Sequence, residues 1–250
     1  MSTQVLEVSV NVAAIDALLT RLLSENNEVR KSGENDLTTF KKQAPNAIVM
    51  ALVSSLENST PTELRQMACS VLHLALVPLK SEESLWMLLL LTNQEAIRTS
   101  LIHRLQNERE PAVLRKLCDL ISDLATHLTE IGTPWNELLS IIFTGTTSPD
   151  PLHREYSLNI FSQLALRLPS DTFRPHFDSI KQILLNGLTD EKTLKVRVSA
   201  LDATTSFIQI MEPVNTYLSI IYILPLSEKC VVIVLNAFFL KNIHIITGSG

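Results

Sequence analysis

Residues 114–128, with the sequence LRKLCDLISDLATHL, show the pattern that decides the fold. Their apolar side chains recur at i, i+3, i+4 and i+7 over two heptads, which predicts an amphipathic α-helix with one buried stripe. Similar stripes occur between residues 15 and 211, around Ile15, Ile48, Ile160 and Ala200. We therefore expect about ten helices between residues 11 and 212, joined by short polar connections.

Five of the expected helices carry, near their start, an arginine that is followed three positions later by a small residue. The arginines lie 35, 50, 39 and 43 residues apart, and the pairs are Arg30 with Gly33, Arg65 with Ala68, Arg115 with Cys118, Arg154 with Ser157, and Arg197 with Ala200. The small residue would let its helix approach a partner closely. The arginine would pair with acidic or carbonyl groups of the neighbouring repeat.

A period near 40 residues with two helices per unit is typical of HEAT repeats. We therefore predict an all-α protein, a right-handed α-α superhelix (HEAT-repeat solenoid) of about five helix pairs, over residues 11–212. The second helices of these pairs are expected near residues 28–42, 61–79, 110–129, 150–167 and 194–211. A compact helical bundle is the alternative.

The composition argues against several functional classes. The 250 residues include only 6 glycines and carry a net charge of -5. They contain no glycine-rich phosphate loop, and an acidic chain is a poor non-specific ligand for nucleic acid. No HExxH or GxSxG motif occurs, and Cys118 lies in an apolar stripe that favours a packed thiol over a nucleophile. We expect no catalytic residue, metal site or cofactor, and three cysteines without a CxxC motif favour an intracellular protein.

Several segments resemble one protein family, in order and in register. They are 64–72 (LRQMACSVL), 114–120 (LRKLCDL), 135–138 (WNEL) and 200–209 (ALDATTSFIQ). Together they resemble the N-terminal HEAT-repeat portion of the karyopherin-β (importin-β) superfamily, in its importin beta-3 branch. The chain departs from the family at 73–75 (HLA), where a double arginine is usual, and at 87–91 (MLLLL), which is more apolar than the family's linker. It is also several times shorter than family members, so we expect an N-terminal portion or a truncated product.

The resemblance implies a nuclear transport receptor that mediates protein import into the nucleus. Its partners would be the small GTPase Ran in its GTP form, the phenylalanine–glycine repeats of nucleoporins, and cargo with nuclear localisation signals. Its location would be the cytoplasm and nucleus, including the nuclear envelope pore. A general HEAT-repeat scaffold or adaptor without Ran dependence is the alternative, because periodicity alone does not separate the two.

The resemblance also implies that Ran contacts the concave face, which the second helices line. Candidate contacts at or near the starts of these helices are Lys31, Arg65, Lys116, Asp119 and Asp123. We expect Arg30, Arg115, Arg154 and Arg197 to be structural residues that bridge adjacent repeats. Arg65 carries the same motif, so a purely structural role is the alternative for it.

Residues 213–250 do not follow the repeat pattern. They contain three charged residues, and their uncharged runs of 15 and 11 residues are shorter than the ~20 apolar residues that a membrane span requires. We expect a divergent apolar tail that is poorly ordered and does not cross a membrane. Membrane anchoring is the alternative.

Overall fold

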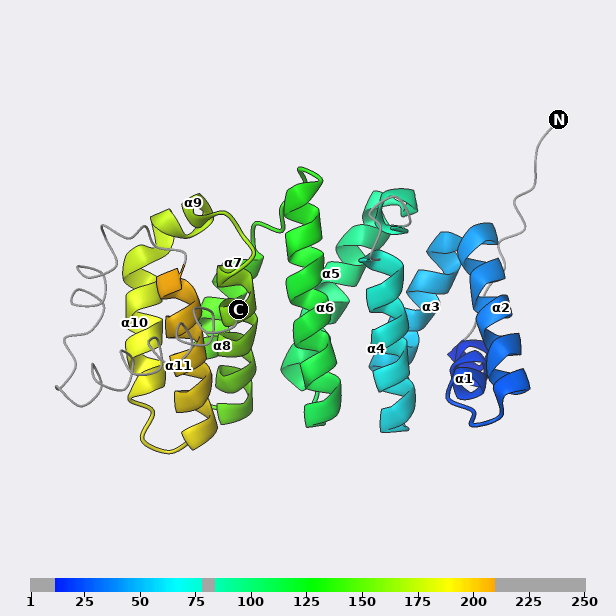
Figure 1. Ribbon diagram of the computed structural model, residues 1–250, viewed down its shortest axis with the longest axis horizontal. Coiled ribbons are helices and arrows are strands. Elements are labelled where there is room, and N and C mark those ends of the chain that lie inside the picture. Colours follow the sequence, from blue (N-terminus) through cyan, green and yellow to red (C-terminus); the bar gives the residue numbers. More distant parts are fainter. Residues whose placement is uncertain (1–11, 78–83, 210–250) are drawn as a thin grey trace, which may run out of the picture. The chain divides into compact units, whose positions relative to one another are not determined.

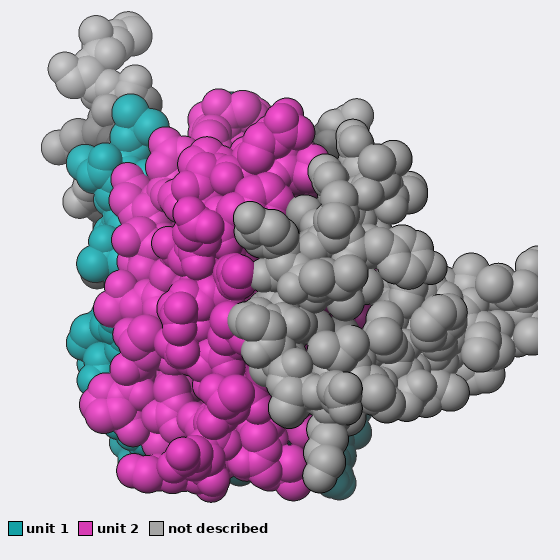
Figure 2. All heavy atoms as spheres, turned by 90° about the vertical axis from the view of Figure 1, so that its left-hand side faces the viewer, with its two compact units in different colours: residues 1–127 teal, residues 128–250 magenta. Residues whose placement is uncertain are grey.

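The computed structural model describes residues 12–77 and 84–209. These residues form α-helices and two short 3-10 helices, and no strand occurs among them. The chain divides into two compact units, residues 1–127 and 128–250, which are coloured separately in Figure 2. The predicted apolar tail at 213–250 lies outside the described residues.

Unit 1 contains three consecutive helix pairs (Figure 1). They are α1 (Val12–Leu22) with α2 (Asn27–Gln43), α3 (Pro45–Asn58) with α4 (Thr62–Leu76), and α5 (Leu91–Asn107) with α6 (Pro111–Glu130), whose last three residues belong to unit 2. The first helix of each pair packs on the first helix of the next, because α1 contacts α3 and α3 contacts α5. The short 3-10 helix η2 (Trp86–Leu88) precedes α5.

Unit 2 contains two further pairs, α7 (Leu138–Thr146) with α8 (Pro151–Ala165) and α10 (Phe177–Leu188) with α11 (Leu194–Gln209). The short elements α9 (Ser170–Phe173) and η3 (Arg174–His176) connect the two pairs. The second helices α8 and α11 pack on each other. Five phenylalanine rings cluster in this unit, with neighbouring centroids 5.5 to 6.2 Å apart. Phe161, Phe173 and Phe207 are buried in its core, and Phe143 and Phe177 are half-buried beside them.

The five predicted helix pairs are confirmed, and the second helices α2, α4, α6, α8 and α11 begin and end close to the predicted residues. Local sequence explains two of the starts. The Asn26 side chain accepts hydrogen bonds from the backbone N–H groups of Glu28 and Val29. Asp150 caps α8 in the same way through the N–H of Leu152, with proline at the first helical position.

The helices of a pair come close together at the small residue of the arginine motif. A Cβ atom on Gly187 of α10 would lie 2.7 Å from the Cβ of Ala200 in α11, and one on Gly145 of α7 would lie 3.2 Å from the Cβ of Ser157 in α8. A Cβ on Gly33 of α2 would lie 3.1 Å from Leu22 Cδ2 of α1. The predicted role of the small residue is confirmed at these three motifs.

We expect the Gly187→Val variant to lower the free energy of unfolding of unit 2 by roughly 1–3 kcal/mol. The reason is that the added side chain would force α10 away from Ala200 of α11. Chemical unfolding followed by circular dichroism measures the change. The control is Asn186→Val, at the exposed neighbouring position of the same helix. An equal effect of the two variants would contradict the close approach.

Candidate interaction surface

Four of the five motif arginines hold the loop that precedes their own helix. The guanidinium groups of Arg30, Arg65 and Arg154 each donate to the carbonyl oxygen six residues earlier, at 3.2, 3.0 and 2.8 Å. Arg197 donates to the carbonyl oxygen of Asp190, at 2.7 Å. The carbonyl groups therefore belong to the arginine's own repeat, and the prediction that they belong to a neighbouring repeat is wrong for these four arginines. The fifth arginine, Arg115, is exposed on α6.

Two of these arginines also bind an acid in the loop between the two helices of the next pair. Arg65 of α4 donates to Glu108 through Nε at 3.0 Å and Nη2 at 3.3 Å. Arg154 of α8 donates to Asp190 through Nε at 3.0 Å and Nη2 at 2.7 Å. Each arginine thus joins its own loop to the next repeat, which is the bridging role predicted for Arg154 and the alternative role for Arg65.

Glu108 is the centre of a buried network. Its side chain is 2% exposed and accepts hydrogen bonds from Arg65 and Arg104, and from the backbone N–H groups of Arg109 and Glu110. Burial alone raises the pKa of a carboxyl group, but these donors outweigh it and lower the pKa of Glu108 to about 2. Asp190 follows the same pattern, because donors led by Arg154 outweigh burial and lower its pKa.

We expect acid to destabilise the protein through Glu108. Its pKa is about 2 in the folded state against an ordinary 4.5, so the unfolded state binds more protons between these values. The stabilisation is therefore complete above pH 4.5 and is lost as the pH falls towards 2. Urea unfolding at pH 7, 4 and 3 measures this loss. The Glu108→Gln variant should show a smaller decrease between pH 7 and pH 3, and an unchanged decrease would contradict the assignment.

Polar side chains also connect the second helices α4 and α6. The Lys116 Nζ donates to Ser70 Oγ at 2.8 Å, and His73 Nε2 lies 2.8 Å from Asp123 Oδ2. Asp119 lies between these two contacts on α6 and is exposed. We define Ser70, His73, Lys116, Asp119 and Asp123 as the α4–α6 stripe. It brings together three of the five candidate contact residues.

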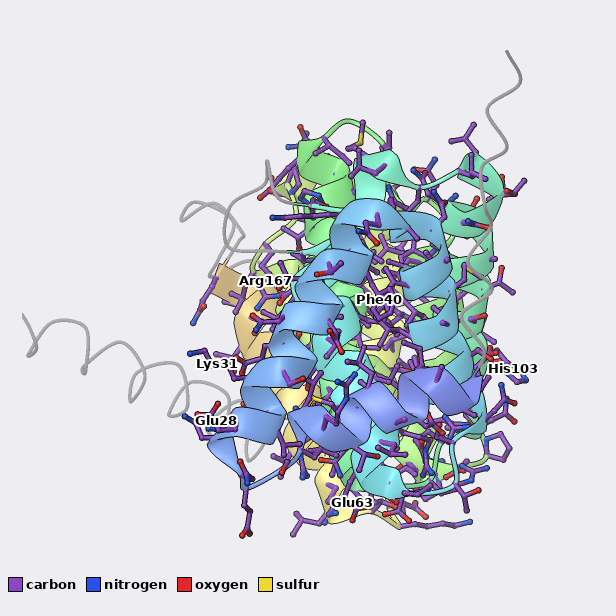
Figure 3. The ribbon with its side chains drawn as sticks, turned by 90° about the vertical axis from the view of Figure 1, so that its right-hand side faces the viewer. Glu28, Lys31, Phe40, Glu63, His103 and Arg167 are labelled. Carbon is purple, nitrogen blue, oxygen red and sulfur yellow. The ribbon has the colours of Figure 1, made fainter. Side chains whose placement is uncertain are left out.

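The other two candidate contact residues lie elsewhere. Lys31 is exposed on α2, and Figure 3 shows that it extends outward from this helix on the same side as Glu28. Arg65 is only 9% exposed and its donors are used within the chain. We therefore group Arg65 with the structural arginines and leave it out of the surface proposed below.

The sequence pattern does not single out Ser70, His73 or Glu108. One signal for Glu108 was available, since an acid stands shortly before the start of both α6 and α11. The contacts of Ser70 and His73 join residues 46 and 50 positions apart and follow no local pattern.

The described helices offer little support for metal binding or catalysis outside these contacts. Among the residues that the structure describes, no three His, Cys, Asp or Glu side chains are placed to hold a metal ion. Cys118 is 2% exposed, so the prediction that it packs inward is confirmed. Burial also raises the pKa of the Cys69 thiol to about 12, which leaves it protonated and unreactive at neutral pH. No helix in the described ranges is long and apolar enough to cross a membrane.

Comparison with known proteins agrees with the helix pairs. Residues 109–224 match the family described as IPO5-like, TPR repeats. The chain is also 26% identical to the probable importin-5 homolog of Dictyostelium discoideum over 200 residues, which cover 79% of this chain and 18% of the relative. The predicted karyopherin-β resemblance is confirmed. The chain therefore spans less than a fifth of the length of this karyopherin relative.

Solved karyopherin structures share the fold. Kap95 in the Kap95:Nup1 complex superposes with a TM-score of 0.69 at 20% identity, covering 85% of this chain and 26% of Kap95. Kap121p bound to RanGTP superposes with a TM-score of 0.64 at 17% identity, covering 84% of this chain and 18% of Kap121p. The predicted HEAT-repeat fold class is thereby confirmed.

Proposed function

We propose that this chain forms part of an importin-β-type nuclear transport receptor and that its second helices bind a Ran-type GTPase in the GTP form. The observation that supports this most directly is the run of five HEAT pairs in the fold of Kap121p, a protein with a structure bound to RanGTP. The relatives are transport receptors, which fits a binding protein and not an enzyme.

The proposed GTPase surface consists of Lys31 on α2 together with Asp119 and its neighbours in the α4–α6 stripe. Lys31 and Asp119 are exposed, so both charges are accessible to a partner. Lys116 and Asp123 are half-buried and hydrogen-bonded to α4, so contacts between α4 and α6 lie on both sides of Asp119 along α6. A rigid surface with charges of both signs favours an oriented protein partner, because such complementarity sets register and specificity.

A pull-down with Ran locked in the GTP and GDP states tests the proposal. We expect retention of the GTP form only. The Lys31→Glu and Asp119→Lys variants should each bind about tenfold more weakly, because charges at the edge of an interface steer association, and reversing one of them places like charges opposite each other. Matched controls are Lys42→Glu at the end of α2 and Glu95→Lys on the first helix α5, both at exposed positions. These controls should bind normally.

Equal or absent retention of the two nucleotide forms would favour the second candidate, a general HEAT-repeat scaffold. The shared architecture keeps this candidate open, because HEAT stacks present long binding surfaces for many protein classes. Under the transport proposal, we further propose nucleoporin phenylalanine–glycine repeats and cargo with nuclear localisation signals as partners. The corresponding location is the cytoplasm and nucleus, including the nuclear pore.

A further inference from the structure

The C-terminal end of α3 is hydrogen-bonded to the helix pairs on both sides of it. Ser59 Oγ donates to the carboxylate of Asp16 in α1, with Oγ–Oδ distances of 2.7 and 2.8 Å. The hydroxyl of Ser55, one turn earlier, donates to the same carboxylate at 2.6 Å. From the third pair, Arg104 of α5 donates to the Glu57 carbonyl oxygen at 3.2 Å. The second helix pair is therefore held by polar contacts to the first pair and to the third.

These contacts belong to one continuous network. The Ser59 carbonyl oxygen accepts from Arg65 Nη1 at 3.0 Å, so the two polar groups of Ser59 join Asp16 to Arg65. Arg65 in turn binds Glu108, and Glu108 also binds Arg104. We call this set the Asp16–Glu108 network, and its members are Asp16, Ser55, Ser59, Arg65, Arg104 and Glu108. It contains side chains from all three helix pairs of unit 1.

Most of the network is shielded from water. Ser55 and Ser59 are 0% and 5% exposed, and the Glu108 side chain is 2% exposed. A buried polar group that loses its partner has no water to replace it, so the neighbouring groups must shift to satisfy it. A change at Asp16 should therefore alter the position of Ser59 and, through the Ser59 carbonyl group, the contacts of Arg65.

A surface ion pair in the first helix pair provides a direct comparison. Arg21 Nη1 of α1 lies 2.7 Å from Asp36 Oδ2 of α2, and the two side chains are 36% and 48% exposed. Water can replace either partner at this degree of exposure, so the ion pair contributes little to stability. Asp36 thus belongs to the same helix pair as Asp16 and lies outside the network.

We propose that the Asp16–Glu108 network couples the first helix pair of unit 1 to the third, so that the three pairs open as one cooperative block. Solenoids are generally stabilised by contacts between adjacent repeats, and substitutions in distant repeats then act independently. Here the buried contacts transmit a change in the first pair across the second pair to the third. The block keeps α2, α4 and α6 at a constant spacing, which suits a partner that contacts more than one of these helices.

A double-mutant cycle between Asp16→Ala and Glu108→Gln tests the coupling. All variants are made in the full chain with Trp135→Phe, so that Trp86 of unit 1 is the remaining tryptophan and its fluorescence follows urea unfolding at pH 7. We expect each single variant to raise the unfolding constant. The double variant should raise it about fivefold less than the product of the two single effects. Single effects that simply multiply would overturn the proposal.

The control cycle combines Asp36→Ala with Glu108→Gln in the same background. Because Asp36 lies outside the network, its effect should multiply with that of Glu108→Gln. An equal departure from multiplication in the two cycles would trace the effect to the unfolded chain, and would also overturn the proposal.

A milder variant keeps the proposal testable if Asp16→Ala does not fold. Ser59→Ala removes the hydroxyl group that binds Asp16 and keeps the backbone carbonyl group of this residue. If the three pairs open together, the variant should accelerate hydrogen exchange in the third pair as well as in the second. We expect about fivefold faster exchange, measured by NMR, at the N–H groups of Arg109 and Glu110, which bond to Glu108.

Asp36→Ala is the control for this measurement and should leave both exchange rates unchanged. Faster exchange in Ser59→Ala that is confined to the end of α3 would show that the second pair opens by itself, and would overturn the proposal. Neither measurement involves the GTPase, so this proposal and the proposed function fail separately.

Discussion

The Glu108→Ala variant should lose about 3–5 kcal/mol of the free energy of unfolding, because removing one partner of a buried ion pair leaves the other charge unpaired. Arg65 would remain only 9% exposed and without its carboxylate, and Arg104 would lose the same partner. Two backbone N–H groups would lose their acceptor as well. Chemical unfolding at pH 7 measures the loss.

Two comparisons separate the ion pair from the loop itself. Glu110→Ala, at an exposed position in the same loop, should change stability by no more than a few tenths of a kcal/mol, as is usual for surface substitutions. The double variant Arg65→Met/Glu108→Leu should recover part of the loss, since apolar residues often replace a buried pair at little cost. A double variant less stable than Glu108→Ala would show that the pair is not the main source of the effect.

In unit 2, the Phe161→Ala variant should lose about 3–5 kcal/mol of the free energy of unfolding, the usual cost of truncating a buried phenylalanine. Phe161 is 1% exposed, and its ring lies 6.2 Å from Phe143 and 5.9 Å from both Phe173 and Phe207. These partners lie in α7, α9 and α11, so the cavity would loosen three elements around α8. Differential scanning calorimetry and urea unfolding measure the effect.

Leu166→Ala provides the control, because this side chain directly follows α8 and is 53% exposed. It should have little effect on unfolding. A similar loss in the two variants, or a Phe161→Ala loss below about 1 kcal/mol, would show that the ring cluster contributes less than its burial indicates.

Most of the helix-pair architecture could be predicted from the sequence because its determinants are local. The 3.6-residue period of the stripe at 114–128 is a property of a single helix, and α6 covers this range. The small residues Gly33, Ser157 and Ala200 were recognisable by their distance from an arginine, since both lie on one helix. The resemblance to karyopherins rests on the same ordered segments.

The candidate surface could be predicted only in part. Lys116, Asp119 and Asp123 fall on one side of α6 by their spacing alone, and the structure places them together. Whether each charge is accessible depends on what the neighbouring helix presents to it. Ser70 and His73 of α4 engage Lys116 and Asp123, which are half-buried, whereas Asp119 is exposed.

By itself, the sequence determined the all-α class, the positions of the five helix pairs and the inward packing of Cys118. These features depend on periodicity within one helix. Only the tertiary structure decided that Arg65 is buried against Glu108 and that Arg115 is exposed although it shares the same motif. It also decided that Leu89 is buried while its neighbours Leu88 and Leu90 are exposed. The physical reason is that these outcomes depend on contacts between residues some 40 positions apart. The packing of the two repeats determines which turn of one helix contacts which loop of the next, and no local sequence pattern predicts it.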